Sequence, residues 1–145
     1  MDLRLRHISK YLNVKLFYQN LFHHTQTDVP NPVEKQFRRS FHKPVAVEWM
    51  MTGDDYEALF YEQQKERIAR FDPSGRLLEV RTNISPLDSS PINNLTVKEM
   101  GDLMNYIQIK RGDCTTHELI IRKPDQTRML ILLDDNFDIV RQEIL

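Results

Sequence analysis

Three groups of residues in the sequence have types and spacings that could perform chemistry. The first, Asp134-x-Asn136-x-Asp138, matches the start of a calcium-binding loop. A loop of that kind needs a glycine at its sixth position and a bidentate glutamate at its twelfth, where this chain has Ile139 and Leu145. The sharp bend and the strongest ligand are missing, so we interpret the segment as a hairpin turn.

Cysteine and histidine form the other two groups. Cys114 and His117 could be drawn as a thiol and its base, but residues three apart on a strand face opposite sides, and no third group orients either side chain. His117 is instead predicted to be a half-buried, hydrogen-bonded histidine. His23-His24 is predicted to be a solvated pair, because adjacent histidines cannot share a helical face. We therefore expect no catalytic residue, no metal site and no cofactor.

The composition excludes several further classes of function. A chain of 145 residues with 40% hydrophobic and 28% charged residues is typical of one globular unit. Its net charge of -1 gives no general attraction to nucleic acid, so no nucleic-acid partner is expected. No apolar run approaches the roughly 20 residues that cross a bilayer. Lys10, Asn13 and Lys15 interrupt the N-terminal run that could resemble a signal peptide, so the sequence as written predicts a cytoplasmic protein.

The elements that would position these residues fall in three segments of an α+β protein. Residues 1–28 form a basic N-terminal segment, predicted to be an irregular amphipathic helix. Residues 29–84 are predicted to form a helix from Val33 to Phe41 and then four antiparallel strands, because the apolar spacing changes from four to two after Pro44. Phe37 and Phe41 of that helix are expected to pack against Trp49 and Phe60.

Residues 92–145 are predicted to form a second helix followed by three or four strands. Thr96 and Glu99 have the spacing of a capping box. The helix that they begin is predicted to end before Gly112, with Met100, Leu103, Met104 and Ile107 on its apolar face. Only Ile107 to Lys110 are available for a first strand, which is predicted to be short or absent. Three strands are expected after it, at 115–122, 127–133 and 139–144.

The two halves share an order of elements, and their turns align. Asp72-Pro73-Ser74-Gly75 is a strong hairpin turn, and Asp134-Asp135-Asn136 falls at the matching place in the second half. Tyr56 to Phe60 likewise aligns with His117 to Ile121. We therefore predict tandem helix-plus-meander repeats that form one compact unit.

The chain resembles the bacterial PepSY-like proteins that are grouped as β-lactamase-inhibitor-like. Residues of the first repeat carry most of the likeness: Val33, Phe37, Phe41 and Pro44, Val47-Glu48-Trp49, Tyr56-Glu57-Ala58-Leu59-Phe60, and Phe71-Asp72-Pro73-Ser74-Gly75-Arg76-Leu77-Leu78-Glu79. It covers about residues 29–145 and is looser in the second repeat. The resemblance implies a duplicated helix-and-meander fold and a non-enzymatic binding or inhibitory module, in the periplasm or secreted.

The sequence therefore predicts a non-catalytic, inhibitor-like module that binds an unknown protein partner. Apolar groups within a charged rim are typical of such a surface. Strand alternation places these candidates on the sheet face opposite the helix or on its continuation in the second half: Met50, Leu59, Tyr61, Ile68, Arg70, Leu77, Ile120, Met129 and Ile131.

Two other functions remain open from the sequence. A carrier or enzyme with a cone-shaped α+β pocket could line its cavity with Trp49, Tyr56, Tyr61 and His117. A membrane-surface adaptor could use the basic residues of segment 1–28, although its irregular apolar stripe makes membrane binding unfavoured.

The apolar run from Met129 to Leu133 raises the question of assembly. Five consecutive apolar residues indicate a strand that is covered on both faces. Leu130 and Leu132 are predicted to face the helix of the second repeat, and the other three side chains to face either the N-terminal segment or a second copy of the chain. A monomer is favoured, and a homodimer is the alternative.

Overall fold

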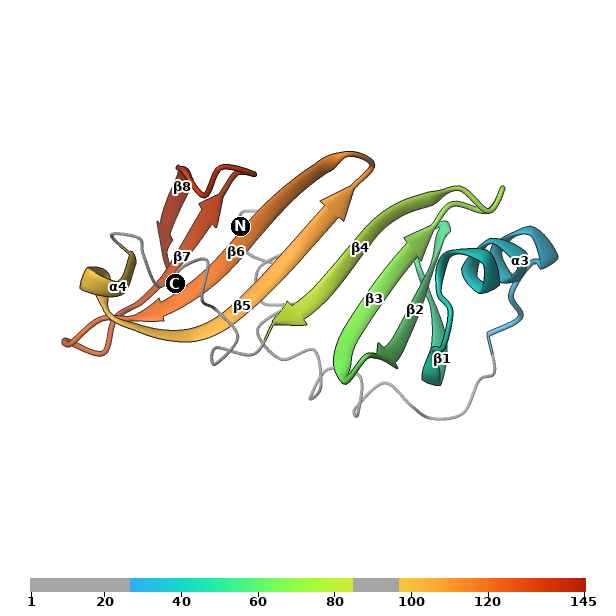
Figure 1. Ribbon diagram of the computed structural model, residues 1–145, viewed down its shortest axis with the longest axis horizontal. Coiled ribbons are helices and arrows are strands. Elements are labelled where there is room, and N and C mark those ends of the chain that lie inside the picture. Colours follow the sequence, from blue (N-terminus) through green and yellow to red (C-terminus); the bar gives the residue numbers. More distant parts are fainter. Residues whose placement is uncertain (1–26, 85–96) are drawn as a thin grey trace.

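The computed structural model of the protein describes residues 27–84 and 97–145. These residues form two helices and eight strands (Figure 1). The first half contains α3 (Asn31–Ser40), β1 (Val45–Thr52), β2 (Asp55–Glu62), β3 (Lys65–Phe71) and β4 (Leu77–Ile84). The second half contains α4 (Val97–Met100), β5 (Asp102–Arg111), β6 (Cys114–Arg122), β7 (Arg128–Leu133) and β8 (Ile139–Ile144).

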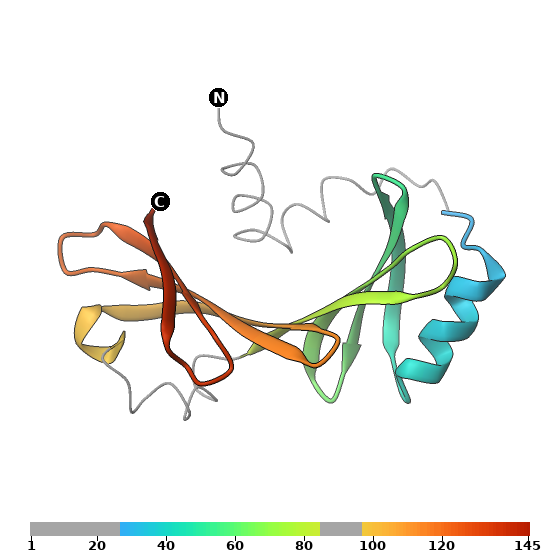
Figure 2. The same cartoon turned by 90° about the horizontal axis from the view of Figure 1, so that it is seen from above.

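All eight strands belong to one antiparallel sheet whose spatial order is the order of the chain, from β1 to β8. The pairing of β4 with β5 joins the two halves edge to edge. The sheet bends along its length, and α3 lies on the outer, convex side (Figure 2). The α+β class that the sequence predicts is therefore confirmed.

Helix α3 forms where the sequence predicts it. Pro30 precedes it, and the backbone N–H of Phe41 closes it with a hydrogen bond to the carbonyl of Phe37 at 3.0 Å. Val33 and Phe37 point into the sheet and are buried. The turn after β3 meets the start of the helix so closely that a Cβ on Gly75 would lie 2.6 Å from the carbonyl oxygen of Pro32.

The predicted helix that begins at Thr96 and ends before Gly112 is wrong. Within the described residues α4 ends at Met100, and the chain continues directly as the long strand β5. Gly101, with φ +151°, separates the two elements, and a Cβ there would lie 2.4 Å from the carbonyl oxygen of Arg122. This close approach of two backbones fixes the start of β5 against the end of β6. The first strand of the second half is therefore neither short nor absent.

The interior of the first half is aromatic. Phe37 packs edge-on against Trp49 and Phe60 with ring centroids 5.1 Å apart in both pairs. Phe41 lies 4.6 Å from Phe60 by the same measure, and Phe71 completes the cluster. The predicted packing of the two helix phenylalanines is thus confirmed.

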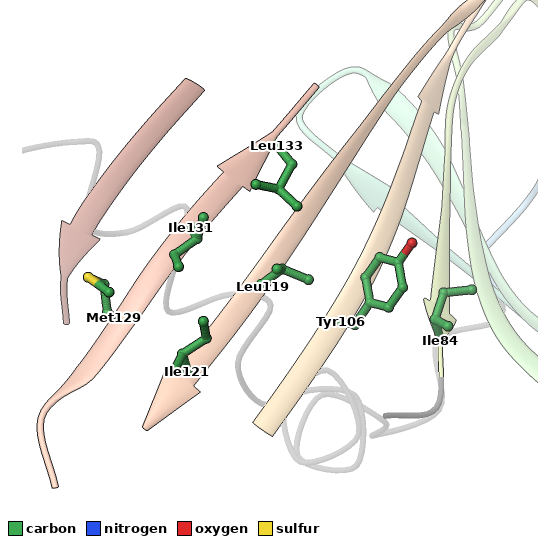
Figure 3. Packing of buried hydrophobic residues seen from close by; sticks show 7 residues of the cluster. All are labelled: Ile84, Tyr106, Leu119, Ile121, Met129, Ile131 and Leu133. Carbon is green, nitrogen blue, oxygen red and sulfur yellow. The ribbon is translucent and has the colours of Figure 1, made fainter. Parts of the chain in front are cut away.

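The interior of the second half is mainly aliphatic (Figure 3). Its buried members are Ile84, Tyr106, Leu119, Ile121, Met129, Ile131 and Leu133. Met100 and Leu103 pack against this cluster from α4 and β5, and Phe137 packs against it from the turn before β8.

The predicted orientation of β7 is wrong. Met129, Ile131 and Leu133 belong to the interior cluster with Met100 and Leu103, while Leu130 pairs with Ile120 on the opposite face. An uninterrupted apolar run carries no alternation, so the sequence could not distinguish the two orientations. The N-terminal segment that was expected to face these side chains lies outside the described residues.

Candidate protein-binding surface

The candidate surface is the sheet face opposite α3, which we call the concave face (Figure 2). Side chains alternate along each strand, so the neighbours of the buried Ala58, Phe60 and Ala69 point to this face. Its residues form rows that cross the strands. One row runs through Glu57, Arg70 and Glu79, which pair directly in the registers of β2 with β3 and of β3 with β4.

The charges of this row alternate in sign, and Arg70 and Glu79 both make close contacts with oppositely charged groups. Arg70 donates from Nε to the Asp55 carboxylate at 2.8 Å. The Glu79 carboxylate lies 2.5 Å from the guanidinium of Arg81 and 2.5 Å from that of Arg111. Opposite charges placed across neighbouring strands stabilise a sheet. The row therefore extends across the joint between the two halves, from β2 to β5.

Two groups on this face, Arg70 and Glu118, have shifted pKa values. Burial lowers the pKa of Arg70, but its hydrogen bond to Asp55 and the surrounding carboxylates outweigh this effect and raise the pKa above its ordinary value. Burial raises the pKa of the Glu118 carboxyl; Glu79 adds to this effect, while Arg81 and Arg111 oppose it. The centre of the concave face thus holds carboxylates and guanidinium groups in fixed mutual positions.

The predicted binding residues do not form one surface. Met50, Leu59 and Ile68 lie together on the concave face. Arg70 and Tyr61 share it, and Tyr61 donates from its hydroxyl to Glu66 at 2.9 Å. The predicted placement of three further residues is wrong. Leu77 packs with the aromatic interior, and Met129 and Ile131 lie in the aliphatic interior. The bulge between β3 and β4 next to Phe71 shifts the alternation and turns Leu77 inward.

The predicted binding residues that do lie on the concave face differ in how exposed their side chains are. Leu59, Ile68 and Ile120 are at most 8% exposed, whereas the side chain of Tyr61 is accessible. Arg111, which is not among the predicted binding residues, keeps 55% of its side chain exposed while it pairs with Glu79. Arg111 was missed because its position was predicted to be the end of a helix, whereas it is the last residue of strand β5. Of these groups, the most accessible are therefore an aromatic ring, that of Tyr61, and a guanidinium, that of Arg111.

His117 occupies the place that the sequence predicts for a satisfied histidine. Its Nδ1 lies 2.8 Å from the Tyr106 hydroxyl, and its ring stacks on Phe137 with centroids 4.4 Å apart. Burial lowers the pKa of His117, and the charges of Asp135 and Asp134 only partly oppose it. His117 is 3% exposed.

The candidate calcium loop is a hairpin turn. The Asp134 carboxylate accepts hydrogen bonds from the backbone N–H groups of Asn136 and Asp138 at 2.9 and 3.0 Å. Asp72 accepts in the same way from Ser74 and Arg76 at 3.0 Å each. No group of three metal-ligating side chains is placed for a metal ion in residues 27–84 and 97–145.

The four residues proposed to line a pocket do not come together in the fold. Trp49 and Tyr56 pack beneath α3, Tyr61 is on the opposite face, and His117 lies in the second half. The membrane-adaptor alternative rests on residues 1–26, which are outside the described part. Among the described helices, none has the length and apolarity to span a bilayer.

The fold is similar to several solved structures. A BLIP-like protein from Bacteroides fragilis superposes with a TM-score of 0.70 at 9% identity, covering 82% of this chain and 88% of that protein. A candidate periplasmic protein from Bacteroides eggerthii gives 0.69 at 16% identity, covering 81% and 90%. A DUF2874 family protein from Bacteroides uniformis gives 0.66 at 15% identity, with the same coverage of both chains.

These likenesses establish a BLIP-like fold, and at such low identities they concern the fold alone. No protein-family model matches the sequence. No curated protein matches it either. The β-lactamase-inhibitor-like part of the resemblance is confirmed at the level of fold, and the PepSY-like part stays a prediction.

Proposed function

We propose that the chain is a non-catalytic, inhibitor-like module that binds a folded protein through its concave face. The observation that carries the proposal is the alternating charge row Glu57–Arg70–Glu79 with Arg111, on the face that α3 leaves free. Charges held in fixed positions discriminate between partners by electrostatic complementarity. Tyr61 adds an accessible aromatic ring at one end of this face, and such residues are enriched among interface hot spots.

The BLIP-like neighbour supports the inhibitor-like part of the proposal, because its fold superposes on this chain with a TM-score of 0.70. A broad sheet face also suits the flat contact with a protein better than it suits the enclosure of a small molecule.

Affinity capture with matched variants tests the proposal. The full chain is immobilised and exposed to a bacterial envelope extract, and the captured proteins are compared between variants by mass spectrometry. A double variant, Tyr61→Ala with Arg111→Glu, should lose a specific captured protein by at least about 10-fold, or about 1.4 kcal/mol. Lys35→Glu, which reverses an exposed charge on α3, is the control and should retain it. Equal capture by all three proteins would contradict the assignment of the face.

We further propose that the two halves are repeats of one unit, covering residues 29–84 and 92–145. The turns at Asp72 and Asp134 support this, because their backbone bonds also correspond: Gly75 N–H to Asp72 O and Phe137 N–H to Asp134 O. Superposition of β1–β4 on β5–β8 tests it, and a mismatch of these turns would refute it.

We propose a place of action outside the cytoplasm. The expectation of a cytoplasmic protein finds no support among the neighbours, and the Bacteroides eggerthii neighbour is a candidate periplasmic protein. Fractionation of the native cell, with immunodetection of the chain in each fraction, tests the proposal. Recovery only from the cytoplasmic fraction would refute it.

A further inference from the structure

The outer edge of the sheet at β8 carries exposed apolar side chains. Val140 is 61% exposed and Ile144 is 67% exposed. β8 pairs with β7 on one side, and no described strand pairs with its other side (Figure 1). An edge strand of this kind is a template for pairing with another chain.

The free backbone groups of β8 are identified by its bonds to β7. The N–H of Leu145 donates to the carbonyl of Arg128 at 2.9 Å, so Leu145 turns its backbone groups toward β7. Because these groups alternate in direction along an antiparallel strand, those of Glu143 and Arg141 also point to β7. Those of Gln142 and Ile144 therefore point away from the sheet.

The charges of β8 select one register for a second copy. When two β8 strands pair antiparallel about a twofold axis at Gln142, Arg141 of each copy comes opposite Glu143 of the other. The outward backbone groups of the two Gln142 residues then bond reciprocally, and Val140 comes opposite Ile144. Registers centred on Arg141 or on Glu143 satisfy the backbone equally but place like charges opposite each other, which destabilises a sheet.

The same register also brings the charged groups together. Arg141 and Glu143 occupy non-hydrogen-bonded positions of the new pair, where the side chains of facing residues are closest. Within one copy the two side chains already form an ion pair on the concave face. A twofold axis perpendicular to the sheet keeps both concave faces on the same side, so the four charges alternate in one group.

The opposite edge of the sheet is protected from such pairing. A bulge interrupts β1 between Val45 and Glu48, and Ala46 has a positive φ of 52°. Bulges of this kind twist an edge strand and prevent its extension.

We propose that the protein forms a homodimer through antiparallel pairing of β8 with β8 of a second copy, centred on Gln142. The dimer joins two eight-stranded sheets into one continuous sheet. The contact is isologous, so it closes after two copies. The proposal is independent of the partner-binding role of the concave face.

Sedimentation velocity of the full chain over a wide range of concentrations tests the dimer. The expected result is a reversible monomer–dimer equilibrium. Gln142→Pro should abolish it, because proline removes an outward N–H that β7 does not use and is tolerated at a sheet edge. Gln142→Thr keeps the N–H and is the matched control, which should still dimerise. Circular dichroism verifies that both variants are folded.

Charge reversal tests the register. Arg141→Glu alone and Glu143→Arg alone each place like charges in both cross-strand pairs, and each should weaken the dimer by on the order of 10-fold or more. An equal mixture of the two variants places opposite charges in both pairs and should restore dimerisation.

Several outcomes would overturn the proposal. These are a monomer at every concentration, a dimer that survives Gln142→Pro, or a mixture of the charge variants that does not associate. Open-ended oligomers would instead indicate pairing of β8 with β1 and would also overturn it.

Discussion

The two halves of the sheet share an order of strands but differ in what fills their interiors. Beneath α3 the first half packs the aromatic rings of Phe37, Phe60 and Phe71. The second half packs aliphatic side chains such as Leu119 and Ile131, and it includes the Tyr106–His117 pair. Its described helix, α4, has four residues, whereas α3 has ten.

The two halves therefore have similar turns but different interior side chains. The turns that close the last hairpin of each half have the same hydrogen bonds around Asp72 and Asp134. At the position where the first turn has Gly75, with φ 91°, the second has Phe137, with φ 64°. Phe137 adopts a conformation that favours glycine, and its ring stacks on His117. The backbone bonds of the turn are therefore compatible with very different interiors.

Removal of a central ring tests the comparison with the largest expected effect. Phe37→Ala should lower the free energy of unfolding by about 3–5 kcal/mol, because it removes buried area and leaves a cavity beneath α3. Chemical denaturation followed by tryptophan fluorescence measures this loss, since Trp49 contacts the Phe37 ring.

Leu119→Ala is the matched truncation in the second half, with an expected loss of about 2–5 kcal/mol. Trp49 reports only the first half. If Leu119→Ala shifts the fluorescence transition as well, the two halves unfold as one unit. An unchanged transition would show that they unfold separately.

The close backbone approach at Gly101 predicts the next largest effect. Gly101→Ala should cost about 2–4 kcal/mol, because backbone strain at positive φ adds to overpacking against the Arg122 carbonyl. Gly112→Ala is the control, since Gly112 also has a positive φ but nothing lies within 4 Å of its Cβ position. Its expected cost is about 1 kcal/mol. Equal thermal stability of the two variants would contradict the steric argument.

Glu118 predicts a pH-dependent effect on the concave face. Its pKa is raised in the folded state, so the folded protein holds this proton more tightly than the unfolded chain does. The associated stability is present below the unfolded pKa of about 4.3 and is lost as the pH rises through the folded pKa. Glu118→Gln should therefore stabilise the protein at about pH 7 and not at about pH 4. Thermal melts at the two pH values measure this, and a gain at the lower pH would contradict it.

His117, on the other face of the same strand, predicts a pH dependence of stability with the opposite sign. Its pKa is lowered in the folded state, so the unfolded chain binds the proton more readily. Stability is retained above the unfolded pKa of about 6.5 and is lost as the pH falls through it toward the folded pKa. His117→Gln should reduce the slope of stability against pH in this range, although it also lowers stability overall. Denaturation at several pH values measures the slope, and an unchanged slope would show that other groups cause it.

Sequence periodicity could predict the elements whose apolar spacing changes clearly. Helix α3 and strands β2 and β3 combine a clear period with strong turns, so they were predicted. β5 was missed because Met100, Leu103 and Ile107 also fit a helical spacing, and because one glycine gives little warning of a close backbone contact. The orientation of β7 had no signal, since every residue from Met129 to Leu133 is apolar.

The candidate surface was harder to predict than the fold. Alternation correctly placed Met50, Leu59 and Ile68 together, but a one-residue bulge was enough to reverse Leu77. The pairing of Arg111 with Glu79 depends on which strand follows β4 in space. That contact between residues 32 apart in sequence could be found only once β5 was known to be a strand.

The sequential order of the strands has a consequence for how the protein folds. Each strand of the sheet pairs with its immediate neighbours in the chain, so no pairing has to wait for two distant segments to meet. Proteins dominated by such local contacts fold faster than sandwiches and barrels, in which strands pair across long loops. The meander can begin at any hairpin and grow outward strand by strand. The connection from Ile84 to Asp102 is the longest between consecutive strands, so we expect its closure to be the slowest step in joining the two halves.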